Sequence, residues 1–150
     1  MRRQLPCLFV VFLLVMSTAC GGGSSTPANV GLFGNWNVAM YPTGSSTAVY
    51  VFALAMSQEG TNNYSGASTT YNGGVPVPNN MCIDNATLRA TANTSTGGSY
   101  TMTITDTTSN TTINVQGTLP TQGTTISGTY SNAASTGCPA SSGTMTMVAQ

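Results

Sequence analysis

The most regular segment of the chain reads Ser99-Tyr100-Thr101-Met102-Thr103-Ile104-Thr105. An apolar or aromatic side chain at each even position alternates with a hydroxyl at each odd position. Successive side chains of a β-strand point to opposite faces of the sheet, so this alternation predicts a strand with one face in an apolar core and the other in water. Such a division is typical of antiparallel sheets. The segment therefore predicts an antiparallel all-β protein.

The same two-residue period recurs along the chain from residue 34 onward, and no window there has the period of an amphipathic helix. Clusters of Gly, Asn, Ser and Pro separate the alternating runs and predict turns. The longest irregular stretch is Tyr71–Met81. We predict eight strands, at Gly34–Met40, Ala48–Ser57, Tyr64–Thr70, Asn85–Ala92, Ser99–Thr105, Thr111–Leu119, Thr124–Tyr130 and Gly143–Ala149.

Eight short strands with mostly short connections favour pairing of each strand with the next one in the sequence. We therefore expect an all-β fold, an eight-stranded antiparallel up-and-down β-barrel, over residues 32–150. The alternative is a Greek-key β-sandwich, which has similar strand lengths and spacing.

The chain is almost free of charge. Of its 150 residues, three are basic and three acidic, which is 4% against a usual value of about 25%. Beyond Arg2 and Arg3, Arg89 is the single cation, so we expect no nucleic-acid partner, because such binding needs a basic footprint. The sequence has no His and no Lys, and we predict no enzymatic activity, no metal site and no cofactor.

The N-terminus has the pattern of a secretory signal. Two arginines are followed by ten apolar residues, Cys7–Met16, and then by small residues. A membrane-spanning helix would need about 20 apolar residues. We therefore predict a signal peptide at residues 1–19 rather than a membrane-spanning helix.

The sequence Ser17-Thr18-Ala19-Cys20, followed by a Gly/Ser run, resembles the lipobox of bacterial lipoproteins. The resemblance implies cleavage before Cys20, acylation of that residue, and a flexible lipidated linker over residues 20–31. It also implies a lipid-anchored protein of the cell envelope, in the outer rather than the inner membrane because Gly21 and not Asp follows the cysteine. Ser17 stands where lipoboxes usually have Leu, Val or Ile, so cleavage after Ala19 to give a secreted protein is the alternative.

Once Cys7 has left with the signal and Cys20 carries lipid, Cys82 and Cys138 remain. Two thiols in an exported chain predict a disulfide, and the alternative is two free buried thiols. Cys82 and Cys138 are 56 positions apart, and closing a loop of that length would stabilise the fold by roughly 4 kcal/mol. In an up-and-down barrel both cysteines lie at the same end, so the bridge would draw the long connection across one barrel mouth.

A Gly-x-Trp motif, Gly34-Asn35-Trp36, resembles the start of lipocalins and of avidin-like barrels. The resemblance implies a small exported barrel in which the tryptophan closes one end. The last strand lacks the basic residue that lipocalins pack on this tryptophan, and we carry over no ligand. Residues expected to line either a ligand cavity or a packed barrel core are Trp36, Tyr50, Phe52, Tyr100, Met102 and Tyr130.

The ionisable groups suggest little chemistry. We expect Arg89 to pair with Asp84. Glu59, Asp84 and Asp106 fall at predicted turns or strand ends, where carboxylates are usually solvated, and a hydrolase would need two of them in one cleft.

Taken together, these features predict a non-enzymatic, membrane-anchored lipoprotein that binds a small apolar ligand or an envelope component. The alternative is a structural or adhesive surface protein, for which the outward-facing Val49, Val51, Ala53 and Ala55 would form an interaction stripe.

Intact mass of the protein purified from its host membranes tests the N-terminal predictions. We expect a mass equal to residues 20–150 plus acyl chains, with a gain of two hydrogen masses on reduction of the disulfide. An unacylated chain in a soluble fraction would contradict the lipid anchor.

Overall fold

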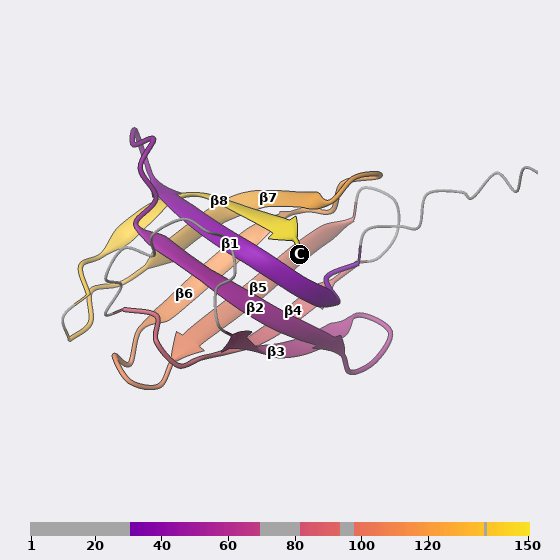
Figure 1. The fold of residues 1–150 in the computed structure, drawn as a ribbon, viewed down its shortest axis with the longest axis horizontal. Coiled ribbons are helices and arrows are strands. Elements are labelled where there is room, and N and C mark those ends of the chain that lie inside the picture. The colour runs from indigo at the N-terminus through magenta and orange to yellow at the C-terminus, as the bar shows by residue number, and fades with distance from the viewer. Residues whose placement is uncertain (1–30, 70–81, 94–97, 137) are drawn as a thin grey trace, which may run out of the picture.

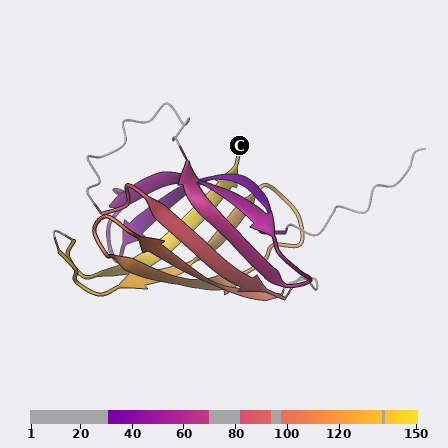
Figure 2. The same ribbon diagram turned by 90° about the horizontal axis from the view of Figure 1, so that it is seen from below.

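The structure, a computed structural model, describes residues 31–69, 82–93, 98–136 and 138–150. Its strands form one closed antiparallel barrel in sequence order, in which β8 also pairs with β1 (Figures 1 and 2). This topology confirms the up-and-down barrel and excludes the Greek-key sandwich. The strands are β1 (Gly34–Pro42), β2 (Tyr50–Gln58), β3 (Asn63–Thr69), β4 (Ala86–Ala92), β5 (Ser99–Asp106), β6 (Thr112–Thr118), β7 (Thr125–Asn132) and β8 (Ser141–Ala149).

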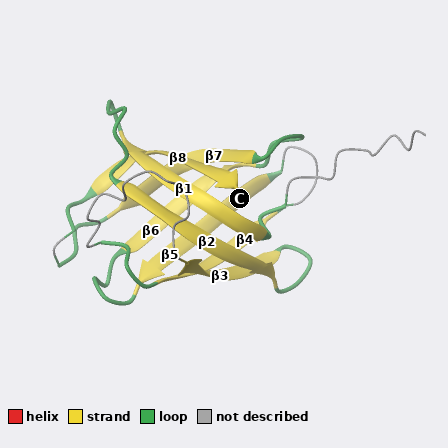
Figure 3. Cartoon of the chain, in the orientation of Figure 1, coloured by secondary structure: helices red, strands yellow, loops and turns green. Residues whose placement is uncertain are grey.

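Strands joined by loops and turns make up the described part of the chain (Figure 3). Within those ranges no helix is long and apolar enough to span a membrane. The predicted signal peptide, the predicted lipidation of Cys20 and the predicted course of the long connection over the barrel mouth concern residues outside the described ranges.

The strand limits differ from the predicted ones where pairing with a neighbour decides them. β7 continues to Asn132 and β8 already begins at Ser141, because these two residues pair with each other. β2 begins at Tyr50, the partner of Met40 on β1, rather than at Ala48. The preference of single residues for β-strands does not indicate which residue lies opposite on the next strand. Sequence patterns therefore locate strands better than they locate strand ends.

The up-and-down order sorts the connections between two barrel ends. At the entry end, the chain enters β1 through Leu32 and leaves β8 at Gln150, and β2–β3, β4–β5 and β6–β7 are joined there. At the opposite end, the connections β3–β4 and β7–β8 carry Cys82 and Cys138, and we call it the disulfide end.

The inward-facing side chains of all eight strands form a single apolar cluster. Trp36 closes the entry end, where its Nε1 donates a hydrogen bond to the Leu32 carbonyl oxygen at 3.0 Å. Leu32 is itself fully buried, so the residues just before β1 complete the core. All six residues predicted to line a cavity or a core are at most 5% exposed: Trp36, Tyr50, Phe52, Tyr100, Met102 and Tyr130.

Tyr100 fills its part of the barrel because two glycines make room for it. Gly117 pairs with Tyr100 across the β5–β6 ladder, and Gly128 pairs with Gly117 across the next ladder. A Cβ atom at Gly128 would lie 2.5 Å from the Tyr100 hydroxyl oxygen and 2.6 Å from the Gln116 carbonyl oxygen. That hydroxyl donates to the Ser127 carbonyl oxygen at 3.1 Å, and burial raises its pKa to about 12.

Substitution of Gly128 tests this packing. Gly128→Ala should lower the free energy of unfolding by about 1–3 kcal/mol, because the added methyl group overpacks the core against Tyr100 and the β6 backbone. Gly60→Ala is the control, since its Cβ would have no neighbour closer than 3.9 Å, and it should change the free energy by less than about 0.5 kcal/mol. Equal denaturation midpoints for the two variants would contradict the close approach.

Candidate functional site

The barrel interior is occupied by the protein's own side chains. An eight-stranded barrel has room for packed side chains or for one small ligand. Here large residues from opposite sides of the barrel, such as Leu54, Met102 and Ile126, are buried in the same cluster. An apolar ligand inside the barrel would have to displace this core, so the interior geometry favours packing over ligand binding.

The disulfide end is tied together by a covalent bridge. Cys82 and Cys138 form the predicted disulfide, with their Cα atoms 5.6 Å apart and a sequence separation of 56. Both cysteines are buried, at 7% and 3% exposure. The bridge joins the β3–β4 and β7–β8 connections, which leave the barrel on opposite sides of its ring.

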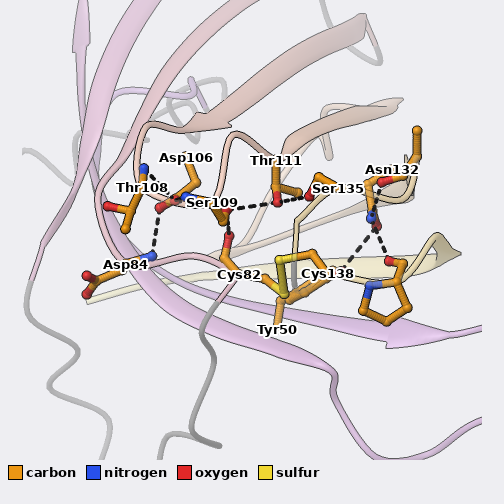
Figure 4. Close-up of a disulfide and its surroundings, with 12 residues drawn as sticks. Tyr50, Cys82, Asp84, Asp106, Thr108, Ser109, Thr111, Asn132, Ser135 and Cys138 are labelled. Carbon is orange, nitrogen blue, oxygen red and sulfur yellow. Dashed lines mark hydrogen bonds between the residues drawn. A yellow bond between two sulfur atoms is a disulfide. The ribbon is translucent and has the colours of Figure 1, made fainter.

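A buried carboxylate organises the polar groups beside this bridge (Figure 4). Asp106 has no exposed surface. One of its oxygens accepts hydrogen bonds from the backbone N–H groups of Asp84 and Asn85, both at 2.7 Å. The other accepts the N–H groups of Thr108 at 3.0 Å and Ser109 at 2.7 Å. Asp106 therefore joins the turn after β5 to the segment that follows Cys82.

These hydrogen bonds decide the charge state of Asp106. Burial disfavours the charged carboxylate and by itself raises the pKa. The N–H groups of Ser109, Asn85 and Asp84 and the Ser109 hydroxyl outweigh burial, and the pKa of Asp106 lies below its ordinary value of 3.8. The carboxylate is therefore ionised at neutral pH and acts as a structural acceptor.

Hydroxyls extend this network to the second cysteine-bearing connection. Ser109 Oγ lies 2.9 Å from the Cys82 carbonyl oxygen and 2.8 Å from Thr111 Oγ1. Thr111 Oγ1 is in turn 2.6 Å from Ser135 Oγ, and Ser135 pairs with Cys138 through the backbone. The polar network and the disulfide thus join the same two connections.

The carboxylates are not arranged as an acid/base pair. Glu59 lies at the entry end, in the connection after β2, whereas Asp84 and Asp106 lie at the disulfide end. Asp106 is fully buried and its oxygens are occupied by hydrogen-bond donors. Figure 4 shows the Asp84 side chain turned away from Asp106. The requirement of a hydrolase for two carboxylates in one cleft is therefore not met among the described residues.

The partner of Arg89 differs from the predicted one. Its Nη1 lies 3.2 Å from Glu59 Oε2, and both side chains are well exposed, at 80% and 47%. The strand register explains the change, because Arg89 faces outward opposite Ser65 on β3, and the Ser65 hydroxyl also donates to Glu59. Asp84 precedes β4 at the disulfide end, away from this pair.

A trough runs across the outer face of the sheet from β3 to β8, with mainly polar lining except in its last part, where Tyr41 and Pro42 of β1 also line it. Its floor is formed by the backbone of inward-facing residues such as Met102 and Tyr130. Three hollows of about 450, 410 and 430 Å³ follow one another along it and share lining residues at Thr101–Thr103 and at Thr129–Tyr130. The trough is therefore one continuous feature.

Two rows of outward-facing side chains in register form the walls of this trough. The strand pairing places the wall nearer the entry end at Asn63, Thr91, Thr101, Gln116, Thr129 and Thr144. The wall nearer the disulfide end consists of Ser65, Arg89, Thr103, Asn114, Ser131 and Ser142.

A side-chain hydrogen bond joins two neighbouring residues in each wall. Thr91 and Thr101 share one at 2.9 Å, and Thr103 donates to Asn114 at 3.4 Å in the other. Arg89 and Glu59 are the charged residues that line the trough, and they neutralise each other. The sequence shows the alternation of each strand, but the rows depend on the register between strands, which the sequence does not report.

The apolar stripe predicted on the second strand is not a free surface. On the outer face of β2, Val51 is 8% exposed and Ala53 is fully buried. Val49 and Ala55 are half-buried. The two large apolar side chains that stand exposed in the described ranges are instead Phe33 and Val148.

Comparison with known proteins gives no relatives: no family model, no curated protein and no solved structure matches the chain.

Replacement of Asp106 tests its structural role. Asp106→Asn should lower the free energy of unfolding at neutral pH by about 1.5–3 kcal/mol, because the amide accepts fewer of the N–H groups that converge there. Asp84→Asn, whose exposed side chain is turned away from the network, is the matched control and should be nearly neutral.

The same carboxylate predicts a pH dependence. Its folded pKa is lower than 3.8, so its contribution is present above pH 3.8 and disappears as the pH falls through the folded pKa. Urea titrations at a series of pH values should show this acid loss in the wild type, and a weaker loss in Asp106→Asn. Parallel acid profiles for the two proteins would contradict the assignment.

Proposed function

We propose that this protein is a non-enzymatic envelope lipoprotein that binds another envelope component on the outer surface of its barrel. The observation that carries the proposal is the contrast between the two faces of the sheet. The inner face is filled by the protein's own core, whereas the outer face offers a continuous polar trough. A small apolar ligand finds little support in this arrangement.

Anchoring through Cys20 agrees with the position of the entry end. Eleven residues separate Cys20 from Leu32, where the barrel begins, and such a spacer reaches at most about 40 Å. Acyl chains on Cys20 would hold the entry end towards the membrane. The trough would remain accessible, because it begins beside Glu59 at the entry end and reaches Thr43 at the disulfide end.

The structural or adhesive alternative relies on a different surface. Its apolar stripe on β2 is largely buried, so an adhesive role would also have to use the polar outer face. Binding at the trough is therefore the version of surface interaction that the geometry supports best.

A co-sedimentation assay tests the proposal. Mature protein, purified from host membranes in detergent, should sediment with isolated envelope fragments of the same host. Asn114→Arg places a long cation in the trough wall and should weaken sedimentation by about tenfold, the effect expected from the loss of one or two hydrogen bonds.

The matched control is Thr112→Arg, because Thr112 is exposed on the same strand, two residues away, and does not line the trough. This variant should bind as the wild type does. Absence of wild-type sedimentation, or equal binding of both variants, would overturn the proposal.

A further inference from the structure

We infer that the trough binds an uncharged polysaccharide strand, which lies across β3 to β8 with its hydroxyl groups against the two walls. The inference rests on the proposed function and specifies the chemistry of the partner. Four properties of the trough carry it: its shape, the groups along its walls, its charge, and the absence of a free strand edge beside it.

The trough has the shape of a site for a linear polymer. Neighbouring strands lie about 4.8 Å apart, so the five spacings from β3 to β8 give a curved path of about 24 Å that follows the outside of the barrel over five of its eight strand spacings. The walls are separated by two residues along each strand, which corresponds to about 7 Å. A compact small molecule would occupy one hollow, whereas three connected hollows accommodate consecutive units of a chain.

The wall groups match a polyhydroxylated chain. Ser and Thr hydroxyls and Asn and Gln amides each offer both donors and acceptors, and sugar hydroxyls require both. Such groups recur on every strand along both walls except at Arg89 on β4, as with Thr101, Gln116 and Thr129. Near its end at the disulfide side, the half-buried Tyr41 adds an aromatic ring, which offers an apolar face to the C–H groups of a sugar.

The charge of the site disfavours an ionic polymer. The two charged groups that line the trough, Arg89 and Glu59, pair at 3.2 Å and leave no net charge there. From residue 20 onward the sequence has one basic and three acidic residues, a net charge of 1 − 3 = −2. A polyanion would be repelled by the net negative charge, and the trough has no cationic patch to bind it. A polycation could interact with one carboxylate in the trough, that of Glu59, which is already paired with Arg89.

The closed sheet disfavours an extended peptide as the partner. Extended peptides commonly bind by adding a strand to a free sheet edge. Each described strand of this barrel has a partner on both sides, because β8 pairs with β1. A chain at the trough must therefore bind through side-chain hydroxyls and amides, which suits a polysaccharide better than a polypeptide backbone.

Selective destruction of the partner tests the inference. Envelope fragments of the host are divided into three portions: untreated, oxidised with periodate to cleave the vicinal diols of sugars, and digested with protease. Sedimentation of the mature protein is then measured with each. We expect periodate to reduce the bound fraction by about tenfold or more and protease to leave it unchanged.

Uncharged variants connect the effect to the trough. Gln116→Ala removes one wall amide and should weaken binding to untreated fragments several-fold, whereas Thr112→Ala, exposed on the same strand but outside the two walls, should not. Equal binding by these two variants would overturn the assignment of the polysaccharide to the trough.

The outcomes separate the inference from the proposed function. Loss of binding after protease but not after periodate would identify a protein partner, which overturns the inference and leaves the proposed function intact. Loss after both treatments would also overturn it, because a polysaccharide alone would then be insufficient. No binding to untreated fragments would overturn the proposed function together with the inference.

Discussion

Closure of the sheet by the pairing of β1 with β8 is the constraint on which the rest of this structure depends. Val38 pairs with Met147 and Met40 with Met145, so the ends of the chain contribute to the same ladder and the same core. Once the sheet is closed, each strand has one inner and one outer face, and a two-residue period assigns each side chain to one of them. The core and the polar trough are consequences of that single division.

The near absence of charge gives unusual weight to the few ionisable groups that remain. Asp106 is buried and its carboxylate accepts four backbone N–H groups, so a single ion joins the turn after β5 to the segment that precedes the neighbouring strand β4. The disulfide joins the β3–β4 and β7–β8 connections, which lie on opposite sides of the ring, by a covalent bond. By contrast, the exposed Arg89–Glu59 pair contributes little to stability, as is usual for surface ion pairs, and its effect is to neutralise the trough.

Much of the fold could be predicted from residue alternation. The pattern around Tyr100, Met102 and Ile104 identified a half-buried strand, and the two thiols left after the N-terminal region identified the disulfide. What escaped prediction depends on contacts between strands. The partner of Arg89 was predicted wrongly because register, not sequence distance, brings Glu59 beside it.

Asp106 was expected to be solvated because its sequence position says nothing of the N–H groups that converge on it. The trough was not predicted at all, because its walls are rows across six strands rather than a motif within one.

Because the first and last strands are neighbours, the chain could be circularly permuted. The Gln150 backbone N–H donates to the Asn35 carbonyl oxygen at 3.0 Å, and its side chain donates to Asn37 Oδ1 at 2.8 Å. Because β8 also pairs with β1, the chain could begin at any strand of the ring without changing which strands are neighbours. A circularly permuted gene that joins these ends and opens at the exposed turn near Gly123 would encode the same cyclic order of neighbours.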